Sequence, residues 1–363
     1  ASAMFAHSVA TAGDVNGDGY SDVIVGAPHF DNGNQNEGRA YAYYGSSAGL
    51  SSIPDWVMES NLTGALLGYS VSTAGDINGD GYSDIIVGSP YYDNGETDEG
   101  RAFVYLGSAS GLSASADWMA EGEQDHASFG FSVSTAGDIN GDGYSDVIVG
   151  AYLFDNNEVD EGRAFVYQGS SSGLSTAADW TGESNQLDSH FAYSVSTAGD
   201  VNGDGYADIM AGAKSYENGE TQEGRAFVYH GSSSGLSSMA NWTAESNQTN
   251  AEFGCALSTA GDVNGDGYSD IVIGAPKYSN GHAEEGGIFV YHGSSTGLQS
   301  SVDWTAESGQ PGAFFGYSVS TAGDINGDGY SYFIAGAFCY EYCQINEGGA
   351  FVFYGNNETG RGL

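Results

Sequence analysis

The residues best suited to chemistry are short oxygen-bearing side chains at alternate positions of an acidic, glycine-rich loop. The first such loop reads Asp-x-Asn-x-Asp-Gly-x-x-Asp over residues 14–22. Positions 1, 3 and 5 aim their side chains into one concavity, and the glycine at position 6 permits a sharp turn. The backbone carbonyl of position 7 and the aspartate at position 9 complete a shell of hard oxygen ligands. Such a shell in a flexible loop favours Ca²⁺ over Mg²⁺ or zinc.

This loop occurs six times, five of them complete. In the sixth copy Tyr332 stands where the last aspartate belongs, so we expect five complete calcium sites and a sixth that is weak or empty. A loop rich in Asp and Gly can be merely a good turn, but five identical ligand patterns favour metal binding. The expected ligands, with each tyrosine contributing its carbonyl, are Asp14, Asn16, Asp18, Tyr20 and Asp22; Asp76, Asn78, Asp80, Tyr82 and Asp84; Asp138, Asn140, Asp142, Tyr144 and Asp146; Asp200, Asn202, Asp204, Tyr206 and Asp208; Asp262, Asn264, Asp266, Tyr268 and Asp270; and Asp324, Asn326, Asp328 and Tyr330.

The elements that position these loops repeat every 62 residues, as the spacing of the Thr-Ala-Gly-Asp segments shows. One repeat reads as four strands separated by turn signals, and in the third copy these strands begin near residues 129, 147, 163 and 179. The middle strands are apolar on both faces, which indicates burial on both faces. No convincing helical period is present.

Six such units predict an all-β protein, a six-bladed β-propeller of four-stranded antiparallel blades that fills residues 1–363 as a single domain. A linear stack would need distinct polar caps at its ends, and none is visible. The alternative is a seven-bladed propeller with one blade outside this sequence. The tryptophan of the fourth strand occurs only five times, so we expect one blade to lack its outer strand. That edge would be open or filled by a strand from elsewhere.

Charge and hydropathy exclude several classes of protein. The chain has 48 acidic residues against seven Lys plus Arg, a formal net charge of −41. A nucleic-acid-binding protein needs a basic face, so we expect no nucleic-acid partner. No run of about 18 apolar residues occurs, so we expect no membrane span.

The cysteines and glycosylation sequons leave alternatives open. Cys339 and Cys343 flank one loop and are either a local disulfide or two free thiols, whereas Cys255 is expected to be a buried free thiol. Sequons that matter only in a eukaryotic or equivalent secretory pathway occur at Asn61, Asn241, Asn247 and Asn357.

The sequence resembles the FG-GAP repeat family, which includes the propeller of integrin α-subunits and many bacterial secreted proteins. The Phe-Gly motif is intact at Phe129-Gly130, and the Gly-Ala-Pro motif is intact at Gly26-Ala27-Pro28. The acidic loop lies between these motifs, as it does in that family. The resemblance covers essentially the whole chain and implies a calcium-binding propeller. Family members serve in adhesion, in glycan binding and as modules attached to enzymes.

We expect no enzymatic activity and no catalytic residue. The four arginines at Glu-Gly-Arg segments occupy one repeat position and are expected to pair with neighbouring acids. This leaves Lys214, Lys277 and Arg361 as scattered cations, too few to neutralise a uronate chain. The histidines form no metal-binding pair, and no nucleophile elbow or phosphate loop is present. The tryptophans, which share one repeat position, are expected to pack between blades.

Non-repeated residues concentrate in the second-to-third and fourth-to-first loops, which should share one face. Recognition often resides in variable loops on a rigid scaffold, although neutral drift explains any single residue equally well. These residues are His29, Tyr91, Leu153, Lys277 and His282 in one set of loops and Leu66, His126, His190, Glu252 and Phe314 in the other.

The sequence therefore favours a secreted or cell-surface, calcium-stabilised propeller that acts as a binding or adhesion module. Its expected partner is an extracellular protein or glycan. One alternative is a calcium-dependent lectin that binds glycans on the variable loop face. Another is a structural repeat protein that assembles through the unpaired blade edge, either as a homo-oligomer or with a strand-donating partner.

Overall fold

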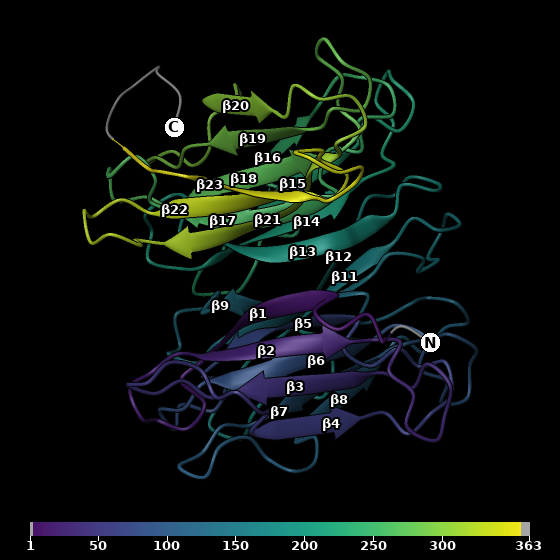
Figure 1. The fold of residues 1–363 in the computed structure, drawn as a ribbon, viewed down its shortest axis with the longest axis vertical. Coiled ribbons are helices and arrows are strands. Elements are labelled where there is room, and N and C mark those ends of the chain that lie inside the picture. Colours follow the sequence, from purple (N-terminus) through teal and green to yellow (C-terminus); the bar gives the residue numbers. More distant parts are fainter. Residues whose placement is uncertain (1–2, 357–363) are drawn as a thin grey trace. The chain divides into compact units, whose positions relative to one another are not determined.

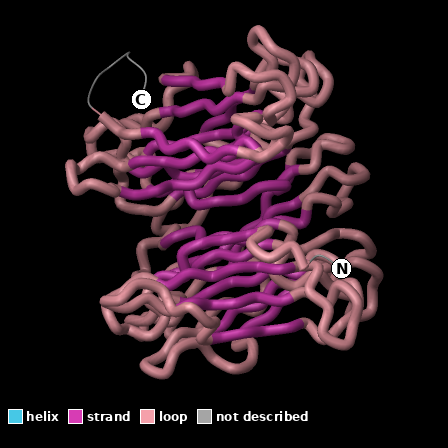
Figure 2. Tube along the Cα trace, in the orientation of Figure 1, coloured by secondary structure: helices cyan, strands magenta, loops and turns pink. Residues whose placement is uncertain are grey.

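The computed structural model describes residues 3–356, which consist of strands joined by turns and loops (Figures 1 and 2). In this part of the chain no helix is present, and so none could cross a membrane. The strands form six antiparallel sheets, each built from strands consecutive in the sequence. The predicted all-β, six-bladed propeller fold with antiparallel blades is thus confirmed.

Five sheets have four strands and the last has three. The first three sheets contain β1 (Ser8–Gly13), β2 (Asp22–Ala27), β3 (Arg39–Tyr43) and β4 (Trp56–Glu59); β5 (Ser70–Gly75), β6 (Asp84–Ser89), β7 (Arg101–Tyr105) and β8 (Trp118–Glu121); and β9 (Ser132–Gly137), β10 (Asp146–Ala151), β11 (Arg163–Tyr167) and β12 (Trp180–Glu183). The others contain β13 (Phe191–Gly199), β14 (Asp208–Ala213), β15 (Arg225–Tyr229) and β16 (Trp242–Glu245); β17 (Ala256–Gly261), β18 (Asp270–Ala275), β19 (Gly287–Tyr291) and β20 (Trp304–Glu307); and β21 (Phe315–Gly323), β22 (Tyr332–Ala337) and β23 (Gly349–Phe353).

The sheets fall into two compact units. The first holds β1 to β12 in residues up to Asp138 and in Asp142–Leu187, and the second holds β13 to β23 with residues 139–141. In the first unit β5 contacts both β1 and β9, and in the second β17 contacts both β13 and β21. The second strand of a blade is sandwiched by this packing, so all six residues of β6 are buried, as the continuous apolar pattern predicted.

Two glycines explain how closely consecutive blades approach. A Cβ at Gly88 in β6 would lie 2.0 Å from the carbonyl oxygen of Gly130, the glycine of the next blade's Phe-Gly motif. Gly130 itself has a φ of +82°, a backbone conformation that glycine adopts without strain. The glycine before Ala-Pro and the glycine after Phe therefore form one backbone contact between blades.

The tryptophan of the outer strand packs against the following blade. In the second sheet, the indole of Trp118 donates a hydrogen bond to the carbonyl of Ser175 at 2.9 Å. Its ring makes an edge contact with Tyr167, with ring centroids 4.7 Å apart. Trp56 makes the corresponding bond to Ser113 at 2.8 Å. These contacts confirm the predicted packing role.

The last sheet, β21 to β23, lacks a fourth strand within residues 3–356, as the five tryptophans predicted. The outer strand β23 pairs only with β22. The Val352 side chain on β23 is 43% exposed, whereas Val104 and Val290 at the same repeat position are fully buried. This edge is therefore more exposed than the third strands of the four-stranded sheets at the same position.

Candidate calcium loops and the variable loop face

The acidic loop between the first two strands winds its backbone around the side chains at positions 1, 3 and 5. In the second repeat, Asp76 Oδ1 accepts hydrogen bonds from the amides of Gly79 and Asp80 at 2.7 and 3.1 Å. Asn78 Oδ1 accepts the Asp80 amide at 3.0 Å, and Asp80 Oδ1 accepts the Tyr82 amide at 3.0 Å. The three side chains predicted as ligands are thus brought together on one concave loop.

The ninth residue of the loop has a structural role that the ligand pattern did not predict. Asp84 is fully buried, and its two oxygens accept the amides of Ile77 at 2.9 Å and Gly107 at 2.8 Å. This carboxylate therefore ties the acidic loop to the turn that follows the third strand. Both bonds recur at the ninth aspartates of the first, fourth and fifth repeats, which are Asp22, Asp208 and Asp270.

The surroundings of Asp84 also bear on whether a cation fits. Burial raises the pKa of this carboxyl to about 7, and the charges of Asp80 and Asp76 act in the same direction, while the two amide bonds oppose them. A carboxylate held in this way beside two others is electrostatically suited to a nearby divalent cation.

The donor chemistry of the loop fits Ca²⁺, because every predicted donor is oxygen and backbone carbonyls can complete the shell. Within residues 3–356, no group of three or more His, Cys, Asp or Glu side chains converges in the manner of a metal site. The predicted ligands of each acidic loop include an asparagine side chain and a backbone carbonyl, and neither belongs to a cluster made only of His, Cys, Asp and Glu side chains. The 29 predicted ligand positions, including those of the Asp138 loop, therefore stay predictions.

The acidic loops of the first, second and fourth repeats also bind the next blade through their backbones. The carbonyl of Asp14 accepts the amide of Ser83 at 3.0 Å, and the carbonyl of Val15 accepts the amide of Ser108 at 3.0 Å. The side chain of Val15 is fully buried and anchors the loop. The loop is consequently part of an interface between blades as well as a candidate ion site.

The sixth loop keeps the fold of the others without the ninth aspartate. Asp324 Oδ2 accepts the Gly329 amide at 2.8 Å, and Asp328 Oδ1 accepts the Tyr330 amide at 3.0 Å, as in the complete loops. Tyr332 is buried and donates its hydroxyl to Asp328 Oδ2. One oxygen of a predicted ligand is therefore already engaged by a proton donor.

The repeated arginines are structural, as predicted. Arg225 Nη2 lies 2.7 Å from Glu245 Oε2, and the guanidinium carbon lies 4.3 Å from the centroid of the Tyr216 ring. Arg101 pairs in the same way with Glu121. These arginines hold the third strand against the fourth and are engaged within their own blades.

The two lysines, in contrast, are not scattered as the sequence suggested. Lys214 follows β14 directly, and Lys277 follows β18 by two residues. Burial lowers the pKa of Lys214, and the charge of Lys277 acts in the same direction. His190 and Glu252, two of the predicted variable-face residues, belong to the same region: His190 Nδ1 lies 3.1 Å from Oγ of Ser215, the residue after Lys214, and Glu252 forms an ion pair with Lys277. Sequence reasoning missed this grouping because the residues come from three repeats.

The structure decides between the two alternatives for Cys339 and Cys343, a disulfide or two thiols. Cys339 and Cys343 are free thiols, so the proposed local disulfide is not formed. Cys255 is a buried thiol, as predicted, and burial raises its pKa to about 12. Of the four sequons, Asn357 lies outside the described residues, as does Arg361.

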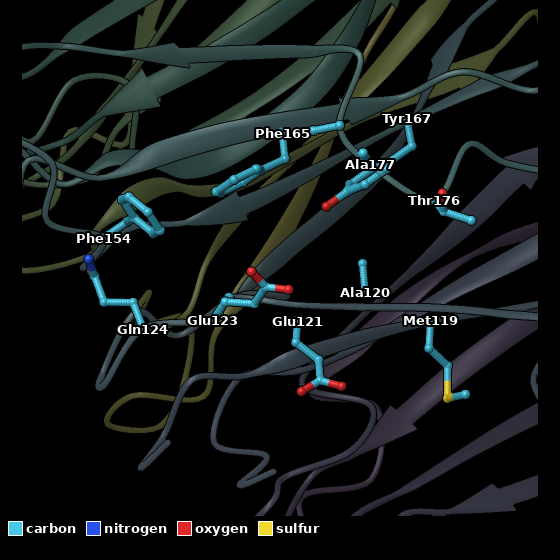
Figure 3. Close-up of a pocket in the computed structure, with 12 residues that line it drawn as sticks. Met119, Ala120, Glu121, Glu123, Gln124, Phe154, Phe165, Tyr167, Thr176 and Ala177 are labelled. Carbon is cyan, nitrogen blue, oxygen red and sulfur yellow. The ribbon is translucent and has the colours of Figure 1, made fainter. Parts of the chain in front are cut away.

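A groove of about 500 Å³ lies between the second and third sheets (Figure 3). Phe154, Phe165 and Tyr167 line one side, and Met119 and Glu121 line the other. A corresponding groove lies one blade earlier. Because Glu121 is paired with Arg101 and a similar groove recurs one blade earlier, this groove reflects the repeated packing of blades.

The family model of the FG-GAP repeat matches residues 5–43, 67–105, 129–167, 191–229 and 253–291, together more than half of the chain. The chain belongs to the FG-GAP repeat family. Each matched FG-GAP segment runs from the Phe-Gly position, through the acidic loop, to the end of the third strand.

Curated relatives are integrin α-subunits. Integrin alpha-5 of Xenopus laevis is 32% identical over 180 residues, which cover 47% of this chain and 17% of that protein. Integrin alpha pat-2 of Caenorhabditis elegans is 34% identical over 227 residues, which cover 58% and 18%. The chain thus spans less than a fifth of these relatives. Among solved structures, the crystal structure of AofleA from Arthrobotrys oligospora covers 95% of this chain and 82% of its own, with 10% identity and a TM-score of 0.47.

Proposed function

We propose that this chain is a single extracellular calcium-binding propeller domain that acts as a non-enzymatic binding or adhesion module, secreted or displayed at a cell surface. The observation that carries the proposal is the winding of each acidic loop around its first, third and fifth side chains, as in Asp76, Asn78 and Asp80. Similarity to integrin α-subunits supports the adhesion part. The partner would be an extracellular protein or glycan.

The ion would be held by the side chains of positions 1, 3, 5 and 9 and by the carbonyl of position 7. When bound, Ca²⁺ supplies positive charge that offsets the repulsion between these carboxylates. The chain's own residues hold the loop in place: Asp84 bonds it to the turn after the third strand, and the buried Ile77 side chain anchors it in the core. Calcium therefore has a stabilising role in this proposal.

Calcium stoichiometry tests the metal part. Binding measured by calorimetry on chelator-treated protein should show five ions per chain, and chelation should lower the unfolding temperature. Asp80→Ala should reduce the stoichiometry by one. Glu158→Gln removes an exposed acid outside the loops and is the matched control, which should leave the stoichiometry unchanged. No calcium binding by folded wild-type protein would overturn the metal part.

Binding to cells and to a glycan array, with calcium and with chelator, tests the module part. Saturable binding to a defined ligand supports it. Folded, calcium-loaded protein that binds neither cells nor glycans would argue for a purely structural role.

A second candidate function is assembly through β23, favoured by the missing fourth strand of the last sheet. Light scattering after size exclusion should then show an oligomer or a complex with a strand-donating partner. Val352→Lys would add a charge on the open strand and disrupt the assembly. Val302→Lys, at another exposed valine outside the strands, is its control. Wild-type protein that is monomeric at every concentration and captures no strand would exclude this function.

A further inference from the structure

The only two lysines of a chain with a net charge of −41 lie in one region of the second unit: Lys214 lies over the Tyr193 ring on β13, and β13 contacts β18, which Lys277 follows by two residues. Neither is required by the repeat. The position of Lys214 is proline in three other repeats, for example Pro276, and is aromatic in two, Tyr152 and Phe338. The fold therefore accepts several residue types here, and packing of the blades does not explain an ammonium group at this position.

The two ammonium groups differ in their partners. Lys277 Nζ lies 2.8 Å from Glu252 Oε1 and forms an ion pair. Lys214 Nζ lies 3.6 Å from the centroid of the Tyr193 ring, and among the described residues no carboxylate forms a salt bridge with it. Burial lowers the pKa of Lys214, because the charged form has lost part of its hydration. The charge of Glu252 partly offsets this loss without forming an ion pair, and a bound carboxylate would supply that pair.

Groups that bind hydroxyls surround these lysines. His190 Nδ1 lies 3.1 Å from Ser215 Oγ, and Ser215 directly follows Lys214. Glu252 accepts from Lys277 through one oxygen. These imidazole, hydroxyl and carboxylate groups include both donors and acceptors, which is what a polyol needs and a simple anion does not.

Two half-exposed aromatic rings belong to the same region. Tyr317 lies on β21, which packs against β17 and β18, and Lys277 follows β18 by two residues. Tyr317 is 50% exposed and packs edge-on against Phe338 with ring centroids 4.7 Å apart, and Phe338 is 51% exposed. Half-exposed rings of this kind offer apolar faces to a sugar ring.

We propose that the region around Lys214, Tyr193, Lys277 and Tyr317 binds a sugar that carries a single carboxylate. The ammonium of Lys214 pairs with the carboxylate, Tyr317 packs against the sugar ring, and His190 and Glu252 bind its hydroxyls. The acidity of the whole chain repels polyanions, so the site suits one acidic sugar at a glycan end rather than a uronate polymer. This inference rests on the proposed function as a binding module.

Calorimetry with glucuronic acid and N-acetylneuraminic acid tests the site, with glucose as the neutral comparison. At least one acidic sugar should bind, and glucose should bind at least about tenfold more weakly. Lys214→Gln should lower the affinity for the acidic sugar by about tenfold or more, and Lys214→Arg should retain most of that affinity. Ser300→Asp makes the net charge more negative by the same amount at an exposed turn and should change nothing.

A second experiment uses the wild-type protein and measures whether a bound sugar protects its lysines from chemical methylation. Because the chain has only two lysines, reductive methylation read by mass spectrometry reports each of them separately. The acidic sugar should slow methylation of Lys214 several-fold, and glucose should not. The proposal is overturned if glucose binds as tightly as the acidic sugars, or if the acidic sugar does not slow methylation of Lys214. It is also overturned if N-acetyl-aspartyl amide slows this methylation equally, because the site would then be assigned to acidic peptides. If the acidic-sugar site is overturned but the protein still binds cells in a calcium-dependent way, the proposed function as a binding module stands. If the protein binds neither cells nor acidic sugars, both proposals fail.

Discussion

The hydroxyl of Tyr332 donates a hydrogen bond of 2.6 Å to Asp328 Oδ2, across the loop in which the five other repeats carry a ninth aspartate. The backbone of this loop is wound as in the complete repeats, so the loop conformation does not depend on the ninth carboxylate. The tyrosine places a proton donor where the other loops offer an acceptor. The sixth repeat can therefore keep the backbone conformation of the loop without a complete set of calcium ligands.

Restoring the aspartate should restore the site. Tyr332→Asp is expected to raise the calcium stoichiometry by one, because it removes the competing hydroxyl and supplies the ninth ligand. Calorimetric titration counts the ions. Tyr332→Phe removes only the hydroxyl and should leave the count unchanged. An unchanged count in Tyr332→Asp would show that the sixth loop is limited by something other than this residue.

The ninth aspartate should stabilise the fold without calcium. In Asp84→Asn the amide group presents a donor to one of the two backbone amides that now bond to the carboxylate, so one buried bond is lost. We expect a loss of about 1–3 kcal/mol in the free energy of unfolding, measured in urea with chelator present. Asp80→Asn, at an exposed ligand position, is the comparison and should cost less than about 1 kcal/mol. Equal losses would contradict the structural role.

The glycine contact between blades makes a sharp steric prediction. Gly88→Ala would place a methyl group 2.0 Å from the Gly130 carbonyl oxygen. Because neither backbone can move without disturbing the interface, we expect a loss of about 2–4 kcal/mol or a failure to fold. Gly49→Ala has open space and a φ of +99°, so only backbone strain of about 1–2 kcal/mol applies. Thermal unfolding of the pair separates the two effects.

The indole bond between blades can be tested by a change that keeps one aromatic ring and removes the N–H donor. Trp118→Phe keeps an aromatic ring but leaves the Ser175 carbonyl without its donor at 2.9 Å. The expected loss is about 1–3 kcal/mol in chemical unfolding. Met119→Ala, one residue along the same strand and 53% exposed, should change stability by less than about 1 kcal/mol. An unchanged free energy of unfolding in Trp118→Phe would contradict a stabilising role for this bond.

The fold was predictable because its signals are local and repeated: the 62-residue period, the apolar second strands and the five tryptophans each point to blades. The missing outer strand followed from the same counting. The ninth aspartate was anticipated only as a ligand, since a spacing pattern does not reveal that Gly107, 23 residues later, donates to it. The association of Lys214 with Lys277 was missed because it depends on how loops of successive repeats meet.

The backbone bonds between the first acidic loop and the next blade couple neighbouring repeats. The carbonyl groups of Asp14 and Val15 accept from Ser83 and Ser108, which lie in the following repeat. A disturbance of one loop therefore reaches its C-terminal neighbour through two hydrogen bonds. Because each bond couples its two partners equally, successive repeats linked in this way should not melt independently, and fraying of either repeat should weaken the other.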